Sequence, residues 1–373
     1  MKKAFIIGPA HPLRGGLATF NERLALEFQS KGYEVVIYTF SLQYPGFLFP
    51  GKTQFSNEPA PKWLNIKVSV NSINPFNWIK IGLQLRKLKP DIIVLRYWLP
   101  FMAPCLGTIA RIAKRKNITK VIAIADNIIP HEKRFGDTIL SKYFTSSCDG
   151  FITMSKAVLQ DLRKFTTLKP GKYYPHPLYD NYGDALDKET ACSLLKLDPN
   201  QNYLLFFGFI RDYKGLDVLL QAMADERIGK LHLKLLVAGE FYTDSKPYFD
   251  LIESLGIKDQ VIMHHHFIPN SSIPAYFSLA DVVVQPYKDA TQSGVTQIAY
   301  FFDKPMIITN VGGLAELVPH EVVGYVVAPE KTALAEAILK FYAENKSIDF
   351  ISNIKTEKKR FSWEGLVKLF ETF

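Results

Sequence analysis

The chain has 373 residues, of which 47% are hydrophobic and 22% charged, a composition that excludes an intrinsically disordered protein. This length exceeds what one hydrophobic core usually serves, so we expect two domains. The net charge of +9 is uneven: residues 1–180 hold 26 lysines and arginines against 11 aspartates and glutamates, and the remainder holds 19 against 25. This asymmetry favours an anionic partner for the first half.

Several classes of protein are disfavoured by the same features. No apolar stretch approaches the roughly 20 residues that span a bilayer. The apolar run 4–7 is too short for a signal peptide, which disfavours a periplasmic binding protein. Cys105, Cys148 and Cys192 are widely spaced, which favours a reduced, cytoplasmic protein and matches no metal-site spacing.

The first half alternates short apolar runs with amphipathic segments. We expect strands at 4–8, 33–40, 91–95, 120–126 and 150–155, with helices between them, including 20–32. This alternation is typical of βαβ units and a doubly wound parallel sheet. Segments 78–89 and 109–120 combine apolar and basic residues at helical spacing, which suits either an anionic membrane surface or solvated helix faces over a core. Nucleic acid is not expected, because no recognition motif is present.

The pattern restarts after residues 168–183, which are rich in proline, glycine and tyrosine. We expect strands at 203–208, 233–239, 260–265, 281–286 and 305–309, and helices at 215–224, 244–256 and 332–345. The predicted fold class is therefore α/β, with two Rossmann-like doubly wound parallel-sheet domains. Because open parallel sheets bind ligands beyond the carboxyl ends of their strands, the two domains are predicted to face a cleft.

Three segments carry candidate anion sites. In "GPAHPLRGGLATF" (8–20), Gly15 and Gly16 precede a helix and would allow close backbone approach to an anion. In "FFGFIRDYKGLDVLL" (206–220), Arg211 and Lys214 follow Gly208 at a strand end, where two cations suit a diphosphate. Each segment alone could be an ordinary loop between a strand and a helix.

The third segment is "KDATQSGVTQIAYFFDKP" (288–305). Thr291 and Ser293 are helix-capping residue types, and Gly294 leaves room for a ligand at the helix start. "TNVGGLAELV" (309–318) repeats the arrangement and carries Glu316. The backbone N–H groups of Ser293, Gly294 and Val295 are predicted to face the same cleft as Arg211 and Lys214.

Together these motifs resemble the retaining glycosyltransferases of the GT-B fold, family 4, over nearly the whole chain. "DKPMIITNVGGLAELV" looks like the family's "GKPVIATDVGGLPEIV". "RFSWEGLVKLF" (360–370) resembles its closing helix, which packs back on the first domain. "DNIIPHEKRFGD" (126–137) is similar to a "HNVLPHE" segment of some members, with His131 and Glu132 matching.

The resemblance implies a domain organisation and a set of site residues. An acceptor-binding domain would span 1–175 and a helix at about 358–373, and a nucleotide-sugar domain would span 176–357. The implied catalytic residues are Arg211, Lys214 and Asp126. The implied substrate-binding residues are Gly15, Gly16, Gly208, His131, His266, Phe267, Ile268, Asp289, Thr291, Gln292, Ser293, Gly294, Val295, Gln297 and Glu316.

The chain departs from the family pattern at four positions. Ala290 and Ile298 stand where the family carries two glutamates, seven residues apart, that approach the donor sugar and ribose. Asp289, Gln292 and Gln297 are the nearest polar substitutes. Phe209 stands where the family often has the arginine, and Asp126 where a histidine often lines the acceptor side.

The predicted enzyme is a hexosyltransferase that moves a sugar, with retention, from a UDP- or GDP-sugar to a saccharide or lipid-linked acceptor in cell-surface polysaccharide biosynthesis. It would be cytoplasmic, either free or peripheral on the inner membrane face, and would need no metal or other cofactor. The alternatives are a non-catalytic sugar-nucleotide sensor or scaffold, which the missing glutamates motivate, and a sugar-nucleotide epimerase, whose candidate acids would be Asp126, Glu132 and Glu316. The run 264–266 of three histidines is interpreted as a loop near the nucleotide base, with a metal site as the less favoured alternative.

Overall fold

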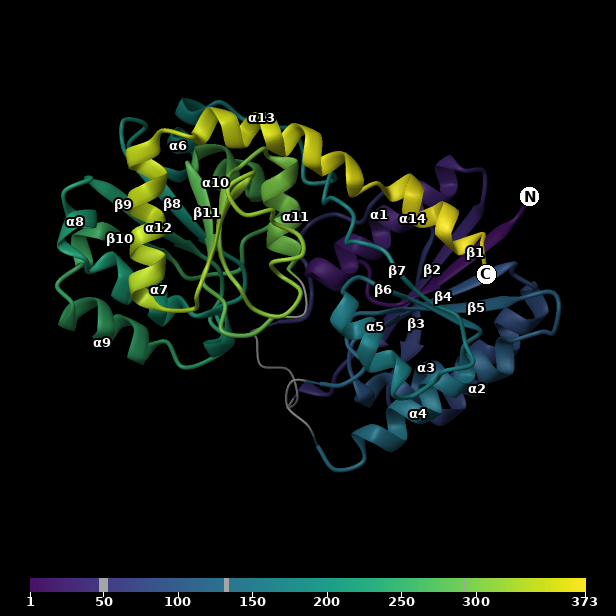
Figure 1. Cartoon of the computed structure of the whole chain (residues 1–373). Coiled ribbons are helices and arrows are strands. Elements are labelled where there is room, and N and C mark those ends of the chain that lie inside the picture. Colours follow the sequence, from purple (N-terminus) through teal and green to yellow (C-terminus); the bar gives the residue numbers. More distant parts are fainter. Residues whose placement is uncertain (47–52, 131–133, 291–292) are drawn as a thin grey trace. The chain divides into compact units, whose positions relative to one another are not determined.

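The computed structural model describes residues 1–46, 53–130, 134–290 and 293–373. The chain divides into two compact units: unit 1 comprises Met1–Pro177 and Phe361–Phe373, and unit 2 comprises Leu178–Arg360. The chain therefore passes between the units twice. Figure 1 draws both units and labels most of their elements.

The sheet of unit 1 has seven strands, all paired in parallel, within the described ranges. They are β1 (Lys3–Ile7), β2 (Glu34–Leu42), β3 (Ile66–Asn71), β4 (Ile92–Tyr97), β5 (Lys120–Ala125), β6 (Gly150–Thr153) and β7 (Gly171–Tyr173). Their order is β3-β2-β1-β4-β5-β6-β7. Ile6 of β1 pairs with Ile37 on one side and Val94 on the other. The strand order reverses at β1, so the switch point of the sheet lies between β1 and β4.

Helices cover both faces of this sheet. They are α1 (Gly16–Ser30), α2 (Pro75–Leu88), α3 (Ala103–Ala113), α4 (Asp137–Ser147), α5 (Lys156–Arg163) and α14 (Trp363–Phe370). Helices α2 to α5 contribute to one core beneath the sheet, while α1 and α14 contact each other on the opposite face (Figure 1).

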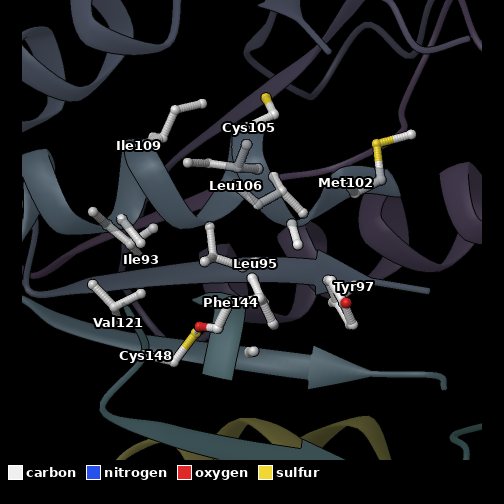
Figure 2. Close-up of a cluster of buried hydrophobic side chains, with 14 of the residues drawn as sticks. Ile93, Leu95, Tyr97, Met102, Cys105, Leu106, Ile109, Val121, Phe144 and Cys148 are labelled. Atoms are coloured by element: carbon white, nitrogen blue, oxygen red, sulfur yellow. Dashed lines mark hydrogen bonds between the residues drawn. The ribbon is translucent and has the colours of Figure 1, made fainter. Parts of the chain in front are cut away.

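The core under α3 and α4 shows why these strands are continuous apolar runs. Ile93, Leu95 and Tyr97 of β4 are fully buried, and the ring of Tyr97 stacks on Phe144 of α4 with centroids 3.9 Å apart (Figure 2). Leu106 of α3 packs in the same cluster. Burial on both faces is the rule for parallel sheets, and it removes the polar alternation seen in half-exposed strands.

Unit 2 repeats the design with a six-stranded parallel sheet of order β10-β9-β8-β11-β12-β13. Its strands are β8 (Asn202–Phe207), β9 (Leu233–Ala238), β10 (Val261–His264), β11 (Val282–Gln285), β12 (Met306–Thr309) and β13 (Gly324–Val327). Its helices are α6 (Lys188–Leu195), α7 (Leu216–Met223), α8 (Glu226–Gly229), α9 (Lys246–Ser254), α10 (Ile273–Leu279), α11 (Gly294–Phe301), α12 (Lys331–Glu344) and α13 (Ser347–Glu357). Side chains of α7, α8, α9, α12 and α13 share one core.

The predicted pair of parallel α/β domains is confirmed, and the differences are local. Helix α1 begins at Gly16, earlier than the predicted residue 20, because Gly15 adopts φ 103° and turns the chain straight into the helix. Strands β3, β7 and β13 were not predicted. Strand β7 lies inside the segment 168–183, which the sequence suggested was only a boundary.

Candidate active site

The ends of β8 and β9 approach each other closely in unit 2. Gly239 adopts φ 157°, and a β-carbon there would lie 1.9 Å from the carbonyl oxygen of Gly208. Gly208 itself adopts φ 102° and donates its N–H to the carbonyl of Ala238 at 2.9 Å. Because neither glycine has a side chain, other groups can approach the backbone beyond β8 closely at the carboxyl edge of the sheet.

Lys214 reaches into this opening. It ends the short 3₁₀ turn Asp212–Lys214, and a β-carbon at Gly208 would lie 3.0 Å from Lys214 Nζ and 3.6 Å from Cγ2 of Val295. The Nζ atom also lies 5.1 Å from the ring centroid of Tyr287. Burial lowers the pKa of Lys214 from its ordinary value, and the charge of Arg211 adds to that effect.

Neither Lys214 nor Arg211 has an anionic partner in the described part of the chain. Their charged groups lie against aromatic rings instead, Lys214 against Tyr287 and Arg211 against Tyr242. Two cations beside a glycine opening, without carboxylates to neutralise them, form a site suited to an anion.

The start of α11 completes this side of the site. Ser293 occupies the capping position with extended backbone angles, but its hydroxyl makes no cap hydrogen bond and lies 3.3 Å from the hydroxyl of Tyr287 instead. The predicted side-chain cap by Ser293 is therefore absent. The N–H groups of the first turn keep their positive potential for a ligand, next to the cation of Lys214.

Aromatic rings extend the site beyond β8, β9 and β10. The ring of Phe209 stacks on Tyr242 with centroids 4.3 Å apart and lies 6.4 Å from Phe267 at an interplanar angle of 29°. The guanidinium of Arg211 lies 5.0 Å from the ring of Tyr242. Phe267, Phe209 and Tyr242 are a series of roughly parallel rings with the cation of Arg211 beside it, which suits a planar heterocycle.

The loop after β12 packs against the segment before α11. Gly313 donates its N–H to the carbonyl of Ala290 at 3.1 Å, and a β-carbon at Gly312 would lie 1.8 Å from the same oxygen. Gly312 adopts φ 48°, which an L side chain rarely adopts. Glu316 follows on this loop and is half-buried. The contact joins two of the predicted segments, 288–305 and 309–318.

The two positions where the family carries glutamates hold buried apolar side chains. Ala290 and Ile298 are each 4% exposed. Among the polar substitutes, Asp289 is exposed, whereas Gln297 is fully buried and neither atom of its amide finds a hydrogen-bond partner among the described residues. Gln297 therefore has no surface through which to contact a ligand in this structure.

Among the described residues, three that were predicted for the site lie in unit 1. Gly15 precedes α1 and Gly16 begins it, at the carboxyl end of β1. Asp126 follows β5, where its two carboxylate oxygens accept hydrogen bonds from Nε and Nη2 of Arg96 at 2.7 and 2.6 Å. Both side chains are buried. The carboxylate of Asp126 is thus held in an ion pair within its own unit.

The histidine run 264–266, which begins with the last residue of β10, makes protein contacts. His264 Nδ1 lies 2.8 Å from the hydroxyl of Tyr276, and the rings of His264 and His266 are 6.1 Å apart. Burial lowers the pKa of His264. Within the described ranges, no group of three or more histidine, cysteine, aspartate or glutamate side chains is arranged to hold a metal ion.

Several predicted residues come together and others do not. Gly208, Lys214, Ser293 and Val295 converge, and Phe267 joins them through the aromatic series, next to buried Ile268. Gly294 begins α11, and a β-carbon there would lie 2.9 Å from the ring of Tyr179. His131, Thr291 and Gln292 lie outside the described residues.

Three aromatic residues of the site were missed at the sequence level: Phe209, Tyr242 and Tyr287. Each stands within a few residues of the end of a parallel strand, as Phe267 does after β10. The sequence therefore already contained a signal for this part of the site: an aromatic residue follows shortly after each of β8, β9, β10 and β11.

The sequence matches family models over most of its length. Residues 14–174 match the model "Glycosyltransferase Family 4", and residues 187–357 match "Glycosyl transferases group 1". The chain belongs to the family 4 glycosyltransferases. Each model falls within one structural unit, so this glycosyltransferase carries both halves of the family's two-domain fold.

Relatives and solved structures agree with this membership. A D-inositol 3-phosphate glycosyltransferase from Segniliparus rotundus is 31% identical over 185 residues, which are 48% of this chain and 41% of that protein. The chain thus matches about two fifths of the length of this curated relative. Sucrose-phosphate synthase from Thermosynechococcus elongatus has the same fold, with a TM-score of 0.76, 16% identity, and coverage of 100% of this chain and 99% of that one. Anabaena HepE in complex with UDP-glucose gives a TM-score of 0.76, 15% identity, and coverage of 99% and 100%.

Proposed function

We propose that this glycosyltransferase moves a hexosyl group, with retention of configuration, from a nucleoside diphosphate sugar to a saccharide or a lipid-linked acceptor. The observation that carries the proposal is a pair of cations that have no anionic partner among the described residues: Lys214, beside Gly208 and the start of α11, and Arg211, beside the ring of Tyr242. A diphosphate supplies the negative charge that this arrangement lacks. That the structural neighbour HepE binds UDP and UDP-glucose supports the same donor class.

The chemistry assigned to these residues is electrostatic. As the bond between the sugar and the diphosphate breaks, negative charge develops on the departing phosphate. Lys214 and Arg211 offset this charge, and the first N–H groups of α11 add donors that are fixed before the reaction begins. The base is proposed to bind near His266, Phe267 and Ile268, by stacking within the aromatic series. UDP and GDP both present such a base.

The acceptor is proposed to bind unit 1, close to Gly15, Gly16 and Asp126. The excess of basic residues in the first half suits an acceptor on the anionic inner face of a membrane, in cell-surface polysaccharide biosynthesis. None of the helices in the described ranges is long and apolar enough to cross a bilayer.

A second candidate function is a non-catalytic sugar-nucleotide sensor or scaffold. The buried apolar residues Ala290 and Ile298 favour it, because they remove the two carboxylates that would approach the donor sugar and ribose. An epimerase is less well supported, because its candidate acid Asp126 is committed to Arg96.

The test first measures the binding of UDP- and GDP-sugars by thermal shift. It then measures the release of the nucleoside diphosphate. Lys214→Ala and Arg211→Ala should each lower donor turnover by roughly 10²-fold, as expected for about 3 kcal/mol of charge stabilisation. Lys230→Ala, an exposed cation of unit 2, is the matched control and should leave turnover unchanged.

Unchanged nucleotide binding and turnover in both variants would place the diphosphate elsewhere. Binding of a donor without hydrolysis or transfer to any acceptor would favour the sensor, and interconversion of donor sugars would favour the epimerase.

A further inference from the structure

Helix α2 has two apolar faces, and only one of them is buried. Ile81 and Leu85 are 3% and 0% exposed and belong to the core of unit 1. On the opposite face, Phe76 is 83% exposed, Ile79 44% and Leu83 54%. These three residues follow i, i+3, i+7 spacing and therefore form one stripe along the helix. An amphipathic helix that only covers a core needs no such second stripe.

The stripe continues onto the neighbouring edge strand. Val68 of β3 and Ile73, which follows β3, are both about half exposed. Asn77 of α2 fixes the helix to the strand: its Nδ2 donates to the carbonyl of Ser69 at 2.9 Å, and its Oδ1 accepts the N–H of Asn71 at 2.8 Å. The exposed apolar side chains of β3, of the turn after it and of α2 thus stand on elements that are joined by Asn77, and we call this set the α2–β3 face: Val68, Ile73, Phe76, Ile79 and Leu83.

The segment of chain that carries the α2–β3 face has charged side chains of a single sign. Residues 59–90 contain no aspartate or glutamate and carry six cations: Lys62, Lys67, Lys80, Arg86, Lys87 and Lys89. Lys80 and Lys87 stand four residues beyond Phe76 and Leu83, on the same side of α2, and both are exposed. No described carboxylate forms an ion pair with either lysine.

We propose that the α2–β3 face docks on an anionic phospholipid surface. Phe76 and Leu83 enter the boundary between headgroups and acyl chains, and Lys80 and Lys87 contact lipid phosphates. This inference deepens the proposed membrane location by naming the surface, and it stands on unit 1 alone, independently of the donor site. At 14 residues, α2 would lie along the surface and not cross it.

The chemistry of the face separates a lipid surface from other anionic partners. Apolar side chains at the centre with lysines alongside match a bilayer, which offers both hydrocarbon and phosphate. A nucleic acid backbone offers phosphate but no partner for an exposed stripe of Phe76, Ile79 and Leu83. Unlike a membrane-spanning helix, such a surface binds reversibly and responds to salt.

The test is flotation of the full chain with vesicles of phosphatidylcholine, with and without phosphatidylglycerol. We expect flotation with the anionic vesicles, weakened by salt, and none with phosphatidylcholine alone. Phe76→Ser with Leu83→Ser should lower the partition coefficient about tenfold or more, because the two apolar side chains that would enter the bilayer are lost. Lys80→Gln with Lys87→Gln should lower it by about tenfold at low salt and by less at high salt.

Matched controls use residues of unit 2. Leu194→Ser with Ile348→Ser removes two exposed apolar side chains, and Lys230→Gln with Lys258→Gln removes two exposed cations; both should float like the parent chain. Equal flotation of the parent and the α2 variants, no binding to anionic vesicles at low salt, or self-association that depends on Phe76 and Leu83 would each overturn the proposal. Donor turnover, measured in the same samples without vesicles, reports on the proposed chemistry separately. The lysine pair keeps the test decisive if the serine pair fails to fold.

Discussion

Arg96 and Asp126 form a buried ion pair in unit 1, whose partners are 30 residues apart in the sequence. Strands β4 and β5 pair in parallel, which brings the end of one beside the end of the other. The guanidinium of Arg96 also lies 4.0 Å from the ring of Phe20. A family resemblance could point to Asp126, but only the strand register shows that Arg96 holds it. The ion pair gives Asp126 a structural role whatever its part in acceptor binding.

Breaking this pair should destabilise unit 1. Asp126→Asn leaves Arg96 charged and buried without its counter-ion, so we expect a loss of roughly 3–5 kcal/mol in the free energy of unfolding. All four tryptophans, Trp63, Trp78, Trp98 and Trp363, belong to unit 1, so urea unfolding followed by tryptophan fluorescence reports on this unit.

The double variant Arg96→Met with Asp126→Leu is the informative partner. It replaces both charges with apolar groups and should recover much of the lost stability. If the double variant is less stable than Asp126→Asn, the buried pair contributes net stability and our account of it is wrong.

Glu22 of α1 is a carboxyl group in an unusual environment. It accepts the backbone N–H of His11 at 2.7 Å, and thereby ties the loop after β1 to the helix that follows. Burial raises the pKa of Glu22 to about 7, the hydrogen bond from His11 opposes the rise, and the charge of Glu58 adds to it. Sequence could not predict this shift, because it depends on how the loop covers the helix.

The raised pKa of Glu22 predicts a pH-dependent stability. Between pH 4.5, its ordinary pKa, and about 7, the folded chain holds a proton that the unfolded chain releases, so this group makes the free energy of unfolding fall as pH rises. Glu22→Gln should remove that contribution and be more stable than the parent above pH 7, by up to about 3 kcal/mol.

The measurement is urea unfolding by tryptophan fluorescence across pH 4 to 8. The difference between the parent and Glu22→Gln isolates this group from the other acids of the chain. Glu34→Gln, a control at a partly exposed acid of the same unit, should follow the parent. Parallel curves for the parent and Glu22→Gln would show that Glu22 titrates normally.

At the scale of elements, α14 is the part of unit 1 that is most distant in sequence. Trp363 is buried, with its ring 4.8 Å from Phe20 and 5.1 Å from the guanidinium of Arg23, both on α1. Phe370 lies 5.3 Å from Phe28 on the same helix. The resemblance of "RFSWEGLVKLF" to the family's closing helix predicted a helix here, and the contacts show that its apolar face covers α1.

Removing the anchor of α14 should weaken unit 1. Trp363→Ala should cost roughly 3–5 kcal/mol in its free energy of unfolding, because a large buried aromatic side chain is lost. Three tryptophans remain to follow unfolding. Glu364→Ala is the control on the same helix: its ion pairs with Lys31 and Lys368 are screened by solvent, so the urea midpoint should hardly change. Similar losses in the two variants would show that α14 contributes through its surface and not its core contact.

Three edge strands, β3, β7 and β13, were the elements that the sequence did not reveal, whereas the edge strand β10 was expected at 260–265. Long buried strands such as β4 and β5 are largely continuous apolar runs, so a strand can be predicted from each run alone. Strand β3 alternates Ile66, Val68 and Val70 with polar residues, and lies at the edge of its sheet, while β7 and β13 have three and four residues. Their pairing is decided by the neighbouring strand and not by their own pattern.

At the scale of the whole molecule, the order of strands and helices was predictable and the details of the site were only partly so. Glycine-containing loops after buried strands indicated Gly208, Lys214 and the start of α11, because parallel strands place such loops at one edge. The aromatic series of Phe209 and Tyr242 joins loops after different strands, so its stacking depended on the fold. The buried state of Gln297 likewise followed from packing against the sheet and not from local pattern.

The two passages of the chain between the units have a consequence for synthesis on the ribosome. Unit 2 is continuous from Leu178 to Arg360, so all of its strands have emerged before α14 is made. Unit 1 starts earlier but lacks α14 until then, and the face of α1 that receives Trp363 stays uncovered during that interval. During synthesis the N-terminal domain usually folds first. Here unit 2 can complete its core before unit 1 does, because unit 1 still lacks α14 at that stage.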